Sequence, residues 1–85
     1  MSAILTLEKI DEALAKCDEL LRERGHIHGC VKFVQGNNSS PGVKNTLISF
    51  KRYIEHYGDL TKKQENALEN ICKGIDKWIE GGSSW

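Results

Sequence analysis

Residues 40–79 constrain the fold most strongly, because helix start and stop signals follow one another closely there. Ser40-Pro41 is a typical helix start, with a serine N-cap and a proline in the first helical position. Gly58 is a typical helix stop. Thr61-Lys62-Lys63-Gln64 fits a capping box, in which the threonine side chain bonds forward and the glutamine side chain bonds back. The stretch therefore predicts one helix over 41–57 and a second over 62–80.

Apolar residues recur at three- and four-residue steps on both predicted helices, which indicates one buried face on each. On the first they are Val43, Leu47, Phe50, Ile54 and Tyr57. On the second they are Leu68, Ile71, Ile75 and Trp78. So short a turn makes the two helices an antiparallel hairpin. Gly74 in mid-helix costs about 1 kcal/mol relative to alanine, so we expect a close approach by another helix there.

A third helix is predicted over 7–24, with Thr6 as N-cap and Gly25 as the stop. Ser2 to Leu5 either extend this helix or form a short strand. Its apolar stripe lets it cover the hairpin, which gives a small, mainly α, three-helix domain over 1–80. Residues 81–85 form a Gly/Ser tail that we expect to be flexible. Trp85 is either the end of that tail or an anchor for a partner.

The segment 26–39 is the least determined part of the chain. Cys30–Val34 is rich enough in β-branched and aromatic residues for a short strand. A lone strand is not stable, and the only other candidate within the chain is Ala3–Leu7. We therefore expect either an irregular or single-turn helical segment, or a two-stranded pairing within the chain or across a dimer. Gly36–Ser40 is a loop.

Composition places the chain among ordinary globular domains. It has 85 residues, of which 39% are hydrophobic and 28% charged, with zero formal net charge, and this argues against wholesale disorder. No apolar run approaches the roughly 18 residues of a membrane span, and residues 1–7 do not resemble a signal peptide. Three cysteines, an odd number, suggest free thiols in a reducing compartment. We expect a cytoplasmic protein with no membrane partner.

No catalytic or metal-binding motif is complete. His26, His28 and Cys30 alternate as H-x-H-x-C, but a fourth ligand and a CxxC pair are missing from this pattern. The chain lacks a phosphate-binding lysine loop and a nucleophile elbow. The loop at 36–42 precedes a helix start and has the form of a weak anion site, although an ordinary connection is the simpler interpretation. We therefore predict no enzyme, no cofactor and no metal.

The charges are unevenly distributed along the chain. Residues 1–30 carry six acidic and four basic groups, residues 31–63 carry two and six, and residues 64–85 carry four and two. A basic middle between acidic ends indicates a polarised surface. Ile48 lies well off the apolar stripe, about 140° from Val43. We predict a partner-binding or nucleic-acid-binding surface made of Lys44, Ile48, Lys51, Arg52, Lys62 and Lys63.

Part of the chain resembles a segment of bacteriophage proteins. Ser49-Phe50, Tyr53, Gly58 through Gln64, Leu68 and Ile71 are similar to F-x-x-S-L, an aromatic residue and G-x-L-[ST]-x-K-Q-x-x-x-L. That segment occurs in replication-associated and small uncharacterised phage proteins. Thr46 stands where the pattern has its first Phe, and Phe50 replaces its Leu. The resemblance covers residues 46–71, about a third of the chain, and implies a phage origin without assigning a role to any residue.

Three functional hypotheses follow. The first is a non-enzymatic interaction protein, a phage accessory or counter-defence factor in the host cytoplasm that binds and inhibits a host protein such as a defence nuclease or toxin. The second is an RNA- or DNA-binding module that uses the basic residues of 44–63. The third is a self-assembling structural protein, which makes a homo-oligomer. We favour a protein partner, because zero net charge argues against general nucleic-acid binding.

Overall fold

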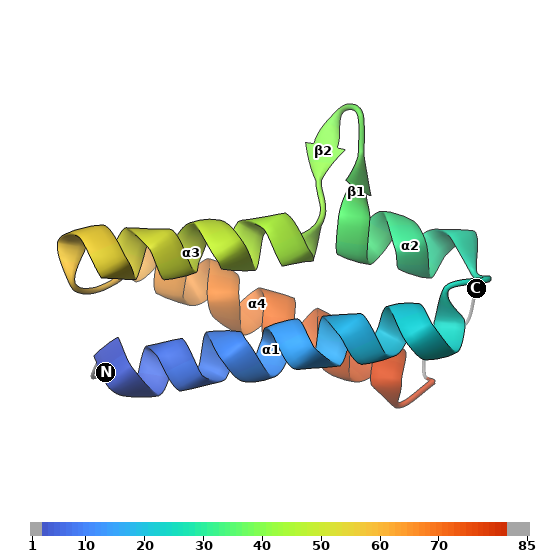
Figure 1. The fold of residues 1–85 in the computed structure, drawn as a ribbon, viewed down its shortest axis with the longest axis horizontal. Helices are drawn as coiled ribbons and strands as arrows, with labels where there is room; N and C mark the ends of the chain where they lie inside the picture. The colour runs from blue at the N-terminus through green and yellow to red at the C-terminus, as the bar shows by residue number, and fades with distance from the viewer. Residues whose placement is uncertain (1–2, 82–85) are drawn as a thin grey trace.

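The computed structural model describes residues 3–81, and the expected tail residues 82–85, Trp85 included, lie outside this range. The fold is mainly α with one short strand pair (Figure 1). The elements are α1 Ala3–Arg24, α2 His28–Gln35, β1 Gly36–Asn37, β2 Ser40–Pro41, α3 Val43–Tyr57 and α4 Lys62–Ile79. The fold class expected from the sequence is confirmed, with an additional short helix in the middle segment. No helix within 3–81 combines the length and the apolar character that crossing a bilayer requires.

Helix α1 lies at the centre of the arrangement, because it contacts α2, α3 and α4. Its buried stripe consists of Ile10, Ala13, Cys17 and Leu20. The helix begins at Ala3, so residues 3–5 extend it and do not form a strand, and the Thr6 N-cap prediction is wrong. Thr6 lies inside the helix and is fully buried. The first turn of α1 instead exposes the apolar side chains of Ile4 and Leu5.

Helix α2 occupies most of the segment that the sequence left open. Cys30–Val34 is helical, so the strand interpretation and the pairing with Ala3–Leu7 are wrong. Cys30 and Val34 are four residues apart, hence on one helical face, and both are fully buried. The Cys30 thiol donates a weak hydrogen bond to the Leu20 carbonyl of α1, with Sγ 4.0 Å from the oxygen. Packing against α1 therefore overrides the strand preference of the individual residues.

Phe33 of α2 fills the space over the middle of α4. Its ring lies 6.1 Å from that of Trp78, centroid to centroid. A Cβ atom on Gly74 would lie only 3.1 Å from Phe33 Cζ. The atoms close to Gly74 therefore belong to an aromatic side chain of α2 and not to the backbone of a neighbouring helix, so the expected close helix–helix approach is wrong.

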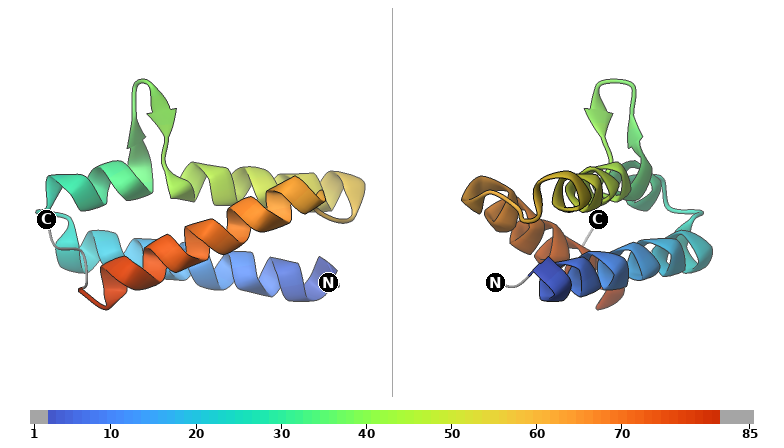
Figure 2. Two further views of the ribbon diagram at one scale, coloured as in Figure 1. Left: turned by 180° about the vertical axis from the view of Figure 1, so that it is seen from behind. Right: turned by 60° about the vertical axis from the view of Figure 1, so that its left-hand side comes forward.

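The short strands form a hairpin between α2 and α3. Gly36 pairs with Pro41 and Asn37 with Ser40. The Ser40-Pro41 pair, expected to start a helix, belongs to β2. The helix start at 41 is therefore wrong, since α3 begins at Val43 after a Gly42 N-cap whose side chain makes no capping bond. Figures 1 and 2 show α2 and α3 nearly in line, with the hairpin projecting sideways from their junction.

The turn between α3 and α4 is the one expected from the sequence. Gly58 adopts the left-handed conformation, with φ +89°, and its N–H donates to the Ile54 carbonyl at 2.7 Å. Thr61 Oγ1 accepts a hydrogen bond from Gln64 N–H at 3.2 Å, and Thr61 N–H donates to Gln64 Oε1 at 2.9 Å. The capping box is confirmed.

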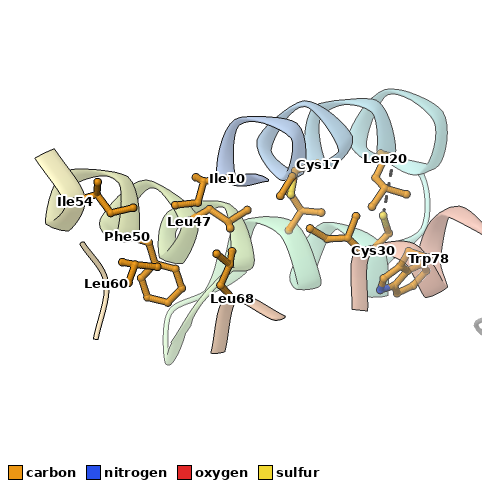
Figure 3. Close-up of a cluster of buried hydrophobic side chains, with 13 residues drawn as sticks. Ile10, Cys17, Leu20, Cys30, Leu47, Phe50, Ile54, Leu60, Leu68 and Trp78 are labelled. Atoms are coloured by element: carbon orange, nitrogen blue, oxygen red, sulfur yellow. Dashed lines mark hydrogen bonds between the residues drawn. The ribbon is translucent and has the colours of Figure 1, made fainter. Parts of the chain in front are cut away.

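Helices α3 and α4 meet near this turn and then diverge (Figure 2). Phe50, Leu60 and Leu68 close the core at the turn end, and Cys17, Leu20, Cys30 and Trp78 form its opposite end (Figure 3). Arg24 ties the C-terminal ends of α1 and α4 together, because its guanidinium donates to the carbonyls of Trp78 and Ile79. These carbonyls lie at the negative end of α4, where a cation is favourable.

Candidate interaction surface

Two of the predicted surface lysines are engaged with α1. Lys44 Nζ lies 3.0 Å from Asp18 Oδ1, and Lys51 Nζ lies 2.9 Å from Asp11 Oδ1. The hydrogen bond to Asp11 raises the pKa of Lys51 above its ordinary value. The two aspartates are seven residues apart on α1, and the two lysines are seven residues apart on α3. The earlier lysine pairs with the later aspartate, as antiparallel helices require. These two cations therefore carry a compensating negative charge beside them.

Ile48 lies between these two ion pairs. It is four residues after Lys44 and three before Lys51, so it shares the face of α3 that is turned towards α1. Its side chain is partly exposed and is not among the residues packed on the core. The surface around Ile48 is thus an α1–α3 seam with balanced charge. Whether it binds a partner stays a prediction.

Of the remaining predicted cations, Arg52 follows Lys51 in the second half of α3, whereas Lys62 and Lys63 open α4 beyond the turn. Arg52, Lys62 and Lys63 are exposed, and none of them makes an ion pair within residues 3–81. Lys62 and Lys63 occupy the first turn of α4, where the helix dipole disfavours positive charge. Their position is therefore not explained by helix stability.

An exposed aromatic cluster lies at the same end. Tyr57 is 69% exposed, although its spacing places it on the predicted apolar stripe. Its ring is 4.6 Å from that of Tyr53 and 5.6 Å from that of His56, which it meets nearly edge-on at 83°. Arg52 and His56, together with Glu55, line an open surface hollow. We call Arg52, Tyr53, His56, Tyr57, Lys62 and Lys63 the turn-end surface.

A second hollow lies between α1 and α4. It is lined by Lys9, Glu12, Ala13, Lys16, Cys72, Ile75 and Asp76. Lys16 spans it, with Nζ 3.4 Å from Asp76 Oδ1 and 3.7 Å from Glu12 Oε1, and the bond to Asp76 raises the pKa of Lys16. Burial raises the pKa of the Cys72 thiol. The hollow therefore holds a protonated thiol and balanced charges, a poor setting for a nucleophile.

The other cysteines are equally unsuited to nucleophilic chemistry. Burial raises the pKa of Cys17 to about 11 and raises that of Cys30 as well. Cys30 is buried whereas His26 and His28 are exposed, so the H-x-H-x-C residues do not share a face. Within residues 3–81 no three His, Cys, Asp or Glu side chains are grouped closely enough to hold a metal ion.

Comparison with protein-family models, with curated proteins and with solved structures finds no match to this chain. The resemblance of residues 46–71 to phage segments is therefore neither supported nor contradicted by these comparisons.

Sequence reasoning missed the exposed aromatic cluster and the two ion pairs of the seam. The cluster was hidden because Tyr57 follows the helical spacing of the buried stripe. The ion pairs had a detectable signal, since Asp11 and Asp18 repeat at the same seven-residue interval as Lys44 and Lys51. That signal becomes informative only once α1 and α3 are known to be antiparallel neighbours.

Proposed function

We propose that this chain is a small non-enzymatic interaction protein that binds another protein through the turn-end surface. The observation that carries the proposal is the 69% exposure of Tyr57 within an aromatic cluster. Tyrosine and arginine are enriched in the residues that dominate binding energy at protein interfaces. The Tyr53 ring lies against the Tyr57 ring, with centroids 4.6 Å apart, and this contact reduces the side-chain freedom that Tyr57 would lose on binding.

The charge arrangement favours a protein partner over a nucleic acid. Lys44 and Lys51 are already paired with α1, whereas the three cations of the proposed surface make no ion pair with any described residue. Glu55 and Asp59 lie close to them in sequence and are also exposed. A mixed surface of this kind suits a partner that presents acidic and apolar groups together, whereas a phosphate backbone rewards a concentration of positive charge.

Affinity capture tests the proposal. The intact protein and its Tyr57→Ala and Arg52→Ala variants are used as bait in bacterial lysate, with and without nuclease treatment. We expect a stoichiometric protein that survives nuclease treatment and is reduced at least tenfold by Tyr57→Ala, a change of about 1.4 kcal/mol. Lys73→Ala is the matched control, because Lys73 is exposed on α4 and its ion-pair partner in the described part of the chain is its helix neighbour Glu69.

Three results would contradict the proposal. Capture of no protein removes it, and so does equal capture by the intact protein and Tyr57→Ala. Retention that disappears with nuclease, and that falls with salt in proportion to the number of neutralised phosphates, supports the nucleic-acid alternative instead.

The more specific form of the proposal is a phage accessory or counter-defence factor that inhibits its host target. It is supported by the resemblance of residues 46–71 alone. If the captured protein is a nuclease or toxin, its activity should fall when the intact chain is added in stoichiometric amount. The same amount of the Tyr57→Ala variant should leave that activity unchanged. Unchanged activity removes this specific form and leaves the binding proposal standing.

A further inference from the structure

The hollow between α1 and α4, which we call the α1–α4 hollow, has room for a small molecule. The two helices cross at an angle and separate towards the N-terminal end of α1 (Figure 2). Two short side chains, Ala13 of α1 and Cys72 of α4, line the space between them, which has a volume of about 190 Å³. An apolar cavity of about 150 Å³ holds benzene, so the α1–α4 hollow admits a molecule of roughly eight non-hydrogen atoms.

The floor of the α1–α4 hollow is uncharged and mostly apolar. Ala13 and Ile75 line it and belong to the hydrophobic core. Cys72 is partly buried, and burial raises the pKa of its thiol, which therefore stays protonated at neutral pH. A hydrocarbon group that covers this floor removes apolar surface from water.

The rim of the hollow carries two carboxylates and a lysine at one end. Lys16 Nζ lies 3.4 Å from Asp76 Oδ1 and 3.7 Å from Glu12 Oε1. Both distances are long for charge-assisted hydrogen bonds, and the side chains of Asp76 and Glu12 are exposed. Each carboxylate can therefore accept a further and shorter hydrogen bond from a ligand.

Lys9 forms the other end of the rim. It precedes Lys16 by seven residues, which is about 10 Å along a helix. Burial is the main cause of the raised Cys72 pKa, and the largest opposing effect comes from Lys9, which places its ammonium near that thiol. Lys9 makes no ion pair with another residue of 3–81. Its ammonium is therefore available to an anionic group of a ligand.

The arrangement of charges limits the class of ligand. The rim has two cations and two carboxylates, so it favours neither a polyphosphate nor a polycation. A simple carboxylate beside Lys9 gains nothing from Glu12 and Asp76, and a simple amine beside these carboxylates gains nothing from Lys9. A molecule that carries one group of each sign uses both ends of the rim.

We propose that the α1–α4 hollow binds a small free α-amino acid with an apolar side chain. The carboxylate of the ligand pairs with Lys9, and its ammonium donates to Asp76 and Glu12. Its hydrocarbon side chain covers the apolar floor. Because this site shares no residue with the turn-end surface, it is independent of the proposed function.

NMR titration of the intact, isotope-labelled chain with L-valine tests the site. Three analogues are the controls: glycine lacks the hydrocarbon side chain, isovalerate lacks the ammonium and isobutylamine lacks the carboxylate. We expect L-valine to shift the amide signals of residues 9–16 and 72–76 saturably, with half-saturation below about 10 mM. Each analogue should need a concentration at least about fivefold higher for the same shifts.

Two kinds of result overturn the site. L-valine that causes no saturable shift in this range, or that shifts only signals outside 9–16 and 72–76, shows that the hollow does not bind it. Half-saturation by isovalerate or by isobutylamine at the same concentration as by L-valine refutes the amino-acid class, because one of the two charged contacts then contributes nothing.

Variants of the rim test the two charged contacts separately. Lys9→Met removes the ammonium and Asp76→Asn removes one carboxylate, and each should raise the half-saturating concentration of L-valine about fivefold or more. Lys73→Met is the matched control, because Lys73 is exposed on α4 and does not line the hollow. Circular dichroism should show that all three variants fold, since none of these side chains belongs to the core.

The variants also separate this site from the turn-end surface. Unchanged L-valine binding by both Lys9→Met and Asp76→Asn refutes the proposed site. Tyr57→Ala should bind L-valine as the intact chain does, and weaker binding by this variant contradicts the independence of the two surfaces. Failure of the amino-acid site leaves the proposed function untouched, because capture of the protein partner depends on Tyr57 and Arg52.

Discussion

The Thr61 capping box offers the sharpest test of the fold, because its contribution can be worked out bond by bond. Thr61→Ala removes the acceptor for Gln64 N–H, now bonded at 3.2 Å, but leaves Gln64 Oε1 free to accept from residue 61 N–H, now at 2.9 Å. Replacing a threonine N-cap by alanine costs about 1 kcal/mol, within a range of about 0.5–2. For a domain of this size, 1 kcal/mol corresponds to a fall of about 4–8 °C in melting temperature.

Thermal and urea unfolding, each followed by circular dichroism, measure this change. The urea midpoint should fall while the dependence of the unfolding free energy on urea stays the same, because the buried area is unaltered. Thr61→Ser should retain most of the stability, since serine is an equally good cap.

Thr46→Ala provides the matched control within a helix. The Thr46 hydroxyl donates to the Gly42 carbonyl at 3.2 Å, but the Thr46 N–H already donates to that oxygen. Alanine also has the higher helix propensity, so we expect a change below about 0.5 kcal/mol. The reasoning fails if Thr61→Ala costs no more than Thr46→Ala, or if Thr61→Ser costs as much as Thr61→Ala.

Three further predictions concern the core and the α1–α4 end. Leu47→Ala should lower the unfolding free energy by about 2–5 kcal/mol, because Leu47 is fully buried; a loss below 1 kcal/mol in urea titration would contradict this burial. Burial raises the pKa of Cys17 to about 11 from an ordinary value of 9.0. The stabilisation by the protonated Cys17 thiol is therefore complete below pH 9 and is lost as the pH rises towards 11, by at most about 2–3 kcal/mol of unfolding free energy. Urea titration of Cys17→Ala and the intact chain between pH 8 and 11 measures this, and parallel pH profiles would refute it. Arg24→Met should cost about 1–2 kcal/mol of unfolding free energy, because it removes two hydrogen bonds to the end of α4. Arg22→Met, whose side chain is exposed in the same last turn of α1, should cost much less.

The parts of the fold that the sequence predicts well are those set by local chemistry. The left-handed stop at Gly58 and the Thr61–Gln64 box depend on residues at most four positions apart. The two long helices that flank them follow from 3.6-residue periodicity. Their signals can therefore be read without knowledge of the rest of the fold.

The parts that the sequence predicts poorly depend on distant contacts. Cys30–Val34 has strand-like composition, and it becomes a helix because Cys30 and Val34 pack on α1. Ser40-Pro41 has a strong helix-start pattern, yet it forms strand β2, which pairs with β1. The backbones of Gly36 and Gly42 lie close together at the base of this hairpin.

The candidate site shows the same division. Arg52, Lys62 and Lys63 are exposed as expected from the sequence. Lys44 and Lys51 form ion pairs with aspartates that are 26 and 40 residues away in the sequence. No local sequence pattern therefore reveals these pairs. Tyr57 has the spacing of the buried stripe but is 69% exposed, and helical periodicity alone cannot show that the buried face of α3 stops before its last residue.

The central position of α1 affects how the chain is made. α1 is translated before every element that covers it, and its last partner, α4, ends 55 residues after α1 does. At ribosomal speeds of about 5–20 residues per second, this delay is about 3–11 s. Until α4 is complete, the packing around Ile10, Cys17 and Leu20 is incomplete even after α2 and α3 have been translated. The acidic and basic side chains on the other faces of α1 must keep the nascent segment in solution during that time.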